Sequence, residues 1–203
     1  MTLRFLVLGD SLAYGTGAAS PQDTLGSRLT RVLRESGRAT ELSVLAVPGA
    51  TSLGLAEQLD RAATVDADLA LLVIGANDLT RQVPADRSAA ALGSAVRTLR
   101  ERGTAVLVVP TPDLSSVAWV PPAFRAVVAG ICDQLRARQT RAVEAAGGVV
   151  APVGPGLAAR FSADPALFSA DRFHPSSAGY ALVAEALAPH LLRLAADRRD
   201  AAA

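Results

Sequence analysis

The sequence predicts a three-layer α/β fold with a flavodoxin-like, five-stranded parallel sheet in the strand order 2-1-3-4-5. Short apolar runs recur five times along the 203 residues, and amphipathic helical patterns separate them. The runs are nearly unbroken, which is typical of strands buried on both faces of a parallel sheet. Regular alternation of strand and helix predicts βαβ units with helices on both faces.

The expected elements follow from these runs and from the capping residues between them. Apolar runs predict strands at 3–8, 42–47, 69–74, 105–109 and 148–153. Pro189 is expected to kink or end the last helix, because proline lacks the backbone N–H. The expected helices are 23–36 before Gly37, one capped by Ser52, one capped by Asp86 and ending before Gly103, one from Pro121 or Pro122 to Gly147, and one from Pro175.

Composition excludes several classes of function. With 20 basic and 19 acidic residues the formal net charge is +1, so neither nucleic acid nor an anionic membrane is expected as a partner. All basic residues are arginines, which excludes a Schiff-base or phosphate-loop lysine. The single cysteine, Cys132, has helical spacing from Val128 and Leu135, which favours a buried core thiol.

The chain is expected to be one domain, 1–203, with 197–203 as a frayed tail. No apolar stretch is long enough to span a bilayer, so no membrane insertion is expected. The first residues lack the pattern of a signal peptide, so the default expectation is a cytoplasmic protein.

Candidate catalytic residues follow the ends of the first three predicted strands. Ser11 follows the first strand in Gly9-Asp10-Ser11-Leu12, Gly49 follows the second, and Asn77 follows the third. In the predicted order the first strand lies between the other two, so these residues meet at the carboxyl edge of the sheet. A central serine flanked by a glycine N–H and a side-chain amide suits acyl transfer, with an oxyanion hole beside the nucleophile. Each residue alone could also serve only as a cap or a turn.

A serine nucleophile needs a base, and the chain offers His174 and His190. His190 lies in a Leu-rich helical segment and is expected on the surface of a helix. His174 lies three residues after Asp171, which can orient the imidazole and fix its tautomer. The 17 residues from Gly154 to Ala170 are long enough to carry this pair back over Ser11. Two distant histidines give no metal-ligand cluster, so neither metal nor cofactor is expected.

Four segments together resemble the SGNH hydrolases, also called GDSL esterases and lipases. They are Gly9-Asp10-Ser11-Leu12, Gly49, Gly75-Ala76-Asn77-Asp78 and Asp171-Arg172-Phe173-His174. Because these segments are distributed along the chain, the resemblance extends over nearly all of it. Val44 stands where members of this family often carry Asn before the second-block glycine.

The resemblance implies a metal-free serine hydrolase that cleaves small-molecule acyl esters or thioesters. It assigns Ser11 as nucleophile, His174 as general base and acid, and Asp171 as the orienting carboxylate. It places the oxyanion hole at the backbone N–H groups of Ser11 and Gly49 and the amide of Asn77. It makes Asp10 and Asp78 structural.

The loop after the fourth strand is the candidate wall of an acyl pocket. It runs from Thr111 to Pro122, has proline near both ends, and carries Leu114 and the only tryptophan, Trp119. The expected pocket residues are Leu12, Leu79, Leu114, Trp119 and Phe173. In the alternative, Trp119 packs on the following long helix and closes the core.

Other classes of protein remain as alternatives. An α/β-hydrolase would need Gly-x-Ser-x-Gly, and the second glycine is replaced by Ala13. A dinucleotide-binding module would need Gly-x-Gly-x-x-Gly after the first strand. The chain has Gly15 and Gly17 there, but Ser20 takes the position of the third glycine. A non-catalytic flavodoxin-like module for small ligands and a deacetylase of acetylated sugars are the further alternatives.

Overall fold

The computed structural model describes residues 2–117, 119–151 and 155–200. Their strands form one parallel sheet in the order β2-β1-β3-β4-β5, which confirms the predicted fold class. The strands are β1 (Leu3–Gly9), β2 (Thr40–Val44), β3 (Leu69–Val73), β4 (Ala105–Val109) and β5 (Val149–Val150).

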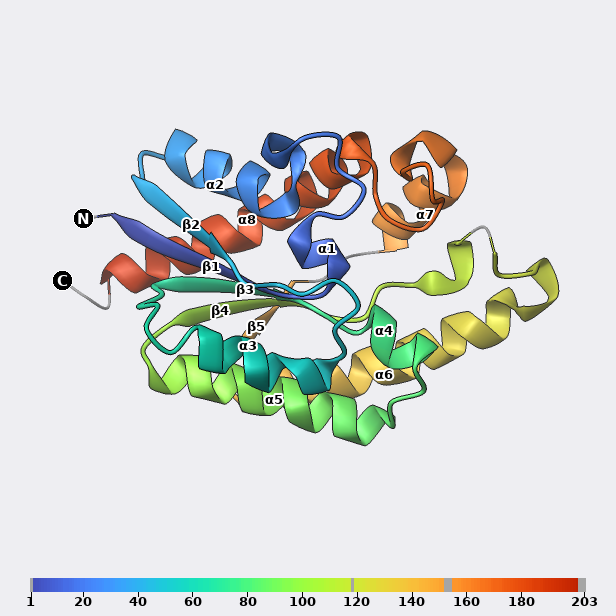
Figure 1. The fold of residues 1–203 in the computed structure, drawn as a ribbon, viewed down its shortest axis with the longest axis horizontal. Helices are drawn as coiled ribbons and strands as arrows, with labels where there is room; N and C mark the ends of the chain where they lie inside the picture. The colour runs from blue at the N-terminus through green and yellow to red at the C-terminus, as the bar shows by residue number, and fades with distance from the viewer. Residues whose placement is uncertain (1, 118, 152–154, 201–203) are drawn as a thin grey trace.

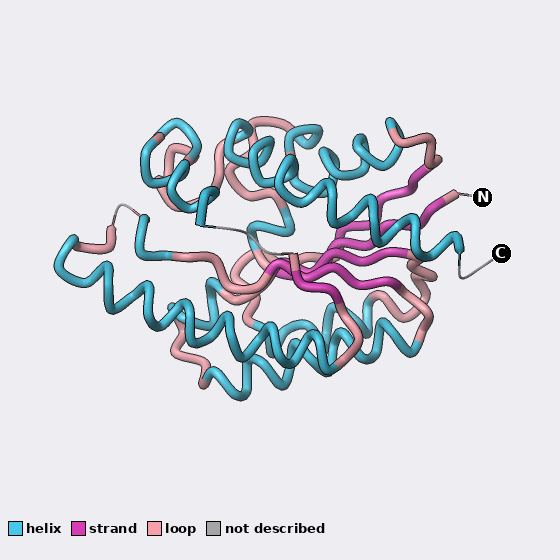
Figure 2. Tube along the Cα trace, turned by 180° about the vertical axis from the view of Figure 1, so that it is seen from behind, coloured by secondary structure: helices cyan, strands magenta, loops and turns pink. Residues whose placement is uncertain are grey.

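Helices cover both faces of this sheet, as Figure 1 shows. Helices α2 and α8 lie on one face, and α3, α5 and α6 lie on the other; Figure 2 shows the same three layers from behind. No helix of the described residues is both long enough and apolar enough to cross a bilayer. The helices are α1 (Ser11–Tyr14), α2 (Leu25–Glu35), α3 (Leu55–Arg61), α4 (Ala76–Thr80), α5 (Ala85–Glu101), α6 (Arg125–Ala145), α7 (Pro155–Ala163) and α8 (Ser177–Asp200).

The interior strand β1 shows why both faces need helices. Phe5 and Val7 pack with buried residues of α2 and α8, whereas Leu6 and Leu8 pack with buried residues of α3 and α5. Successive strand residues point to opposite faces, so an unbroken apolar run supplies two cores at once. These two cores hold β1 inside the sheet, with its carboxyl end beside the ends of β2 and β3.

Several expected element bounds were wrong by a few residues. Strand β2 ends at Val44, although Leu45 and Val47 still donate backbone hydrogen bonds to β1. Strand β5 has two residues, and 152–153 of the expected strand lie outside the described residues. Ser52 does not cap α3, because its hydroxyl donates to Asp78 instead. Asp86 lies inside α5, where it contacts Arg138.

Pro189 does not end the last helix. Helix α8 continues through it to Asp200, which includes the first part of the expected frayed tail; 201–203 lie outside the described residues. Leu187 and Leu191 on either side of the proline are buried in the same core. Their burial, worth about 1.5–3 kcal/mol each, offsets the hydrogen bond that proline removes.

Candidate active site

Ser11 is the first residue of α1, directly beyond the carboxyl end of β1, and is 8% exposed. Gly9 turns the chain there with a φ of 132°, and a Cβ at this position would collide with the carbonyl oxygen of Val73. The side-chain amide of Gln58 bonds both backbone groups of Gly9 at 2.8 Å. The turn therefore requires glycine and fixes Ser11 at the edge of the sheet.

The three candidate catalytic side chains meet in one chain of hydrogen bonds. The Nε2 atom of His174 lies 2.9 Å from Ser11 Oγ, and its Nδ1 atom lies 2.6 Å from Asp171 Oδ2. The structure thus brings together residues 163 positions apart in the chain. A hydroxyl, an imidazole and a carboxylate in this order can move the hydroxyl proton to the ring and hold the resulting charge.

Asp171 is fixed as an acceptor by several donors. Its Oδ1 atom accepts from the Ser169 hydroxyl at 2.8 Å and from the N–H groups of Phe173 and His174 at 2.9 Å. Partial burial opposes ionisation, but these bonds and the His174 ring together hold the pKa of Asp171 well below its usual range. The carboxylate is therefore charged whenever the protein is folded near neutral pH, and it selects the tautomer with the proton on Nδ1.

The loop that carries this pair is short and internally bonded. Ser169 N–H donates to the His174 carbonyl at 2.8 Å, and Phe168 bridges to Pro175. Arg172 at the tip has a φ of 55°, which is an uncommon conformation for a side chain with a Cβ. These bonds hold the imidazole in place within an irregular loop.

The three candidate oxyanion donors come from the ends of β1, β2 and β3. Gly49 has a φ of 80°, and the Asn77 side-chain Nδ2 donates one N–H to the Ala50 carbonyl at 3.0 Å. That bond fixes the amide plane and leaves the second N–H of Nδ2 available. Neither Ser11 N–H nor Gly49 N–H donates a hydrogen bond to another described residue. Unused donors at adjacent strand ends are what an oxyanion hole requires.

The aspartate before Ser11 is buried and only half satisfied. Asp10 is 1% exposed, and its Oδ1 accepts from Leu12 N–H at 2.9 Å, which caps α1. Its Oδ2 has no hydrogen-bond partner among the described residues. Burial raises the pKa of Asp10 to about 7, with a further rise from the charge of Asp78 and a partial opposing effect of the Leu12 N–H.

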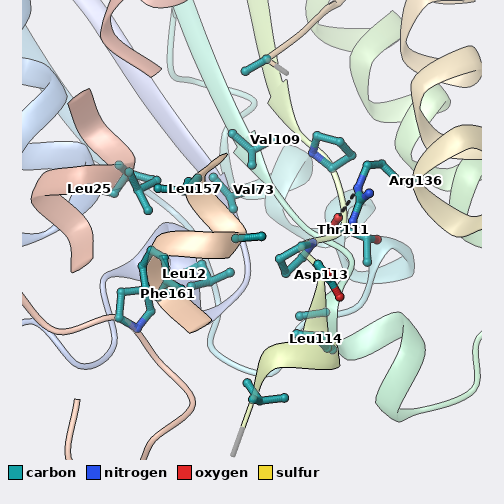
Figure 3. Close-up of a pocket in the computed structure, with 18 of the residues that line it drawn as sticks. Leu12, Leu25, Val73, Val109, Thr111, Asp113, Leu114, Arg136, Leu157 and Phe161 are labelled. Atoms are coloured by element: carbon teal, nitrogen blue, oxygen red, sulfur yellow. Dashed lines mark hydrogen bonds between the residues drawn. The ribbon is translucent and has the colours of Figure 1, made fainter. Parts of the chain in front are cut away.

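A cavity of about 940 Å³ opens beside Ser11. Figure 3 shows side chains of α7, Leu157 and Phe161, together with Leu12, on one side of it, and Thr111 and Leu114 of the loop after β4 on the other. Its wall is mainly apolar, and a cavity of this size suits an acyl chain. Helix α7 was not predicted, although the Leu157–Phe161 spacing of four residues was a helical signal.

Three of the five candidate pocket residues line this cavity, namely Leu12, Leu114 and Phe173. Leu79 is not among the lining residues and packs against the small core around Cys132. Trp119 does not line the cavity either; its ring lies 6.1 Å from that of Phe173, which in turn packs edge-on against the His174 ring. Because Trp119 is 56% exposed, the alternative in which it closes the core is wrong.

The other candidate groups lie outside this site. His190 is on α8, and the Cys132 thiol is buried, as expected, and accepts a long hydrogen bond from Leu114 N–H. Among the described ranges, no group of three His, Cys, Asp or Glu side chains could hold a metal ion.

Comparison with known sequences gives the same assignment as the four blocks. The family model of the GDSL-like lipases/acylhydrolases matches residues 7–182. The chain is 42% identical over 189 residues to the GDSL-like esterase Rv1075c of Mycobacterium tuberculosis (strain ATCC 25618 / H37Rv). That match covers 91% of this chain and 60% of the relative, so the chain spans less than two thirds of its length.

Solved structures share the fold at low identity. TesA superposes with a TM-score of 0.78 at 21% identity, covering 94% of this chain and 99% of that one. Axe2, an acetylxylan esterase from Geobacillus stearothermophilus, gives a TM-score of 0.73 at 19% identity, covering 93% and 94%. EstA, an esterase from Pseudoalteromonas sp., gives 0.71 at 16%, covering 94% and 96%. The sequence match and the shared fold lead to one conclusion: the chain belongs to the GDSL-like lipase/acylhydrolase family.

Proposed function

We propose that this chain is a serine hydrolase that cleaves carboxylic esters or thioesters through an acyl-enzyme on Ser11. The observation that carries this proposal is the hydrogen-bonded triad of Ser11, His174 and Asp171. His174 Nε2 lies 2.9 Å from Ser11 Oγ, and His174 Nδ1 lies 2.6 Å from Asp171 Oδ2. The proposal treats 1–203 as one catalytic domain. Membership of a family of lipases and acylhydrolases supports the reaction class.

In the acylation step, Ser11 Oγ attacks the carbonyl carbon while His174 Nε2 takes the hydroxyl proton. The carbonyl oxygen becomes an oxyanion, which accepts hydrogen bonds from the N–H groups of Ser11 and Gly49 and from the amide of Asn77. Asp171 stabilises the imidazolium without taking its proton. The oxyanion collapses, the imidazolium protonates the leaving alcohol or thiol, and the acyl group stays on Ser11.

In the second step, water replaces the leaving group. His174 takes one proton from it, and the hydroxide attacks the acyl carbonyl through a second oxyanion in the same hole. Collapse releases the carboxylic acid and returns the proton to Ser11. No metal is needed in either step, so activity is expected to survive treatment with a chelator.

The acyl group is proposed to enter the cavity between α7 and the loop after β4. Leu12 and Phe173, the sequence neighbours of Ser11 and His174, line this cavity, and so do Leu114 and Phe161. Each buried CH₂ contributes about 0.8 kcal/mol, so chains that extend into the cavity should gain several-fold in kcat/KM per methylene.

Hydrolysis of acyl esters of increasing length tests the proposal. Wild type is expected to hydrolyse acetyl esters and to improve with length until the cavity is filled, and Ser11→Ala is expected to lose nearly all activity while its circular dichroism spectrum stays unchanged. An active Ser11→Ala protein would contradict the proposal.

A second substrate class belongs in the same assay, because the acetylxylan esterase Axe2 shares this fold. Acetylated xylo-oligosaccharides carry a small acyl group and a large polar leaving group. Turnover of these in preference to esters with longer acyl groups would assign the chain to deacetylation and leave the apolar cavity unused.

A further inference from the structure

A buried chain of hydrogen bonds connects the segment of the candidate oxyanion donor to helix α6. Gln139 of α6 donates through Nε2 to Ser88 Oγ at 3.2 Å, and Ser88 Oγ lies 3.1 Å from Ser52 Oγ. Ser52 donates its hydroxyl to Asp78 Oδ2 at 3.2 Å. At the other end, Gln139 Oε1 accepts from Thr111 N–H at 2.9 Å and from Thr111 Oγ1 at 2.8 Å.

With Asp78 ionised, the bonds of this chain all run in one direction. A carboxylate oxygen of Asp78 accepts, so the Ser52 hydroxyl donates to it, and the Ser88 hydroxyl must then donate to Ser52. The order of donors is therefore Thr111, Gln139, Ser88, Ser52, ending on Asp78. All five side chains are at most 1% exposed, and hydrogen bonds aligned in one direction in a buried site strengthen one another.

The chain ends beside Asn77. Asp78 follows it in α4, a helix of only five residues that has no side-chain N-cap. Gly75, which precedes α4, has a φ of 131°, and a Cβ there would overlap the Thr111 hydroxyl and lie 2.9 Å from Gln139 Nε2. Both ends of the segment that holds Asn77 thus rest on this buried group of side chains.

We propose that Gln139 is a positioning residue for the reaction: through Ser88, Ser52 and Asp78 it holds α4 so that the free N–H of Asn77 points at the oxyanion. This inference rests on the proposed function, in which Asn77 stabilises that oxyanion. Gln139 touches neither substrate nor reacting atoms. Its effect is therefore on the placement of a donor, and it appears in kcat more than in KM.

The variant Gln139→Met keeps a similar unbranched shape and removes every bond that the amide makes. Loss of a whole oxyanion donor lowers kcat by about 10²–10³, and a loosened donor costs less, so a decrease of about tenfold is expected. An acetyl ester is the substrate, because its short acyl group makes the least use of the cavity. Ser88→Ala removes the middle of the chain from a different helix and is expected to give the same kinetic result.

A double-mutant cycle with Asn77→Ala separates positioning from general damage. In the Asn77→Ala background, Gln139→Met is expected to lower kcat less than twofold, because the donor that it positions is absent. Thr104→Val is the matched control: it removes a buried hydroxyl that donates to the Ala67 carbonyl at 2.9 Å, at the opposite edge of the sheet. It is expected to lower the melting temperature and leave kcat unchanged.

Two outcomes would overturn the inference. One is an unchanged kcat in both Gln139→Met and Ser88→Ala; the other is an equal fold-loss from Gln139→Met with and without Asn77. Failure of the proposed function looks different, because Asn77→Ala itself would then keep the wild-type kcat, or Ser11→Ala would remain active.

Discussion

Replacing Asp10 by asparagine should change how stability depends on pH. The carboxyl group is buried beside Ser11, and burial raises its pKa to about 7 from an ordinary value of 3.8. Asparagine keeps the Oδ1 acceptor for the Leu12 N–H and replaces the unpartnered Oδ2 with an uncharged amide. The variant therefore removes one titration and preserves the cap of α1.

The sign follows from proton binding in the two states. Between pH 4 and 7 the unfolded chain has lost the Asp10 proton, whereas the folded protein still holds it. The free energy of unfolding of wild type therefore falls as pH rises through this range. The difference between about 7 and 3.8 corresponds, at 1.36 kcal/mol per pKa unit, to about 4 kcal/mol. Relative to wild type, Asp10→Asn should thus gain up to about 4 kcal/mol in free energy of unfolding between pH 4 and 8.

Urea unfolding of both proteins at several pH values measures this difference directly. Asp60→Asn is the control, because Asp60 is exposed on α3, and its difference from wild type should stay nearly constant over the same range. A constant difference for Asp10→Asn as well would show that Asp10 is ionised throughout and would refute the reasoning.

Four further predictions concern the rate of reaction. Asn77→Ala should lower kcat by about 10²–10³ with a smaller change in KM, and an unchanged kcat would make Asn77 a turn residue. Asp171→Asn should lower kcat by up to about 10⁴, because the imidazole loses its orienting carboxylate. In wild type, the rate should fall on acidification, because a protonated imidazole cannot accept the Ser11 proton, whereas Asp171, whose pKa lies below its usual range, stays charged; a rate that rises into acid would contradict this. Trp119→Ala should change the acyl-length profile through its contact with Phe173 and leave the melting temperature nearly unchanged, because Trp119 is 56% exposed; an equal loss on all chain lengths would contradict it.

Much of the fold was predictable because one pattern specifies it. Doubly buried strands read as continuous apolar runs, so β1, β3 and β4 were found almost to the residue. Strand β5 and helix α7 were harder to predict. Strand β5 is an edge strand of only two residues. Helix α7 turns its apolar residues toward the cavity and not toward the main core, so its role depends on the folded structure.

The candidate triad was predictable because its residues lie in short sequence motifs. The buried residues that position the site, such as Gln139, were not predictable. Gln139 lies 62 positions after Asn77, and no local rule relates the two. One signal was present: Gln139 is the polar member of a buried stripe with Cys132, Leu135 and Val143 on α6. A buried polar residue needs partners, but the sequence does not say which ones, because they come from other helices and loops.

The most direct test of the account is covalent labelling with an alkyl fluorophosphonate, followed by mass spectrometry of the digested protein. The account predicts one label per chain, on Ser11, at a rate that falls when His174 is replaced by alanine, and no label on Ser11→Ala. Modification of Cys132 or of another serine in wild type, or undiminished labelling of Ser11→Ala, would contradict the assignment of Ser11 as the nucleophile.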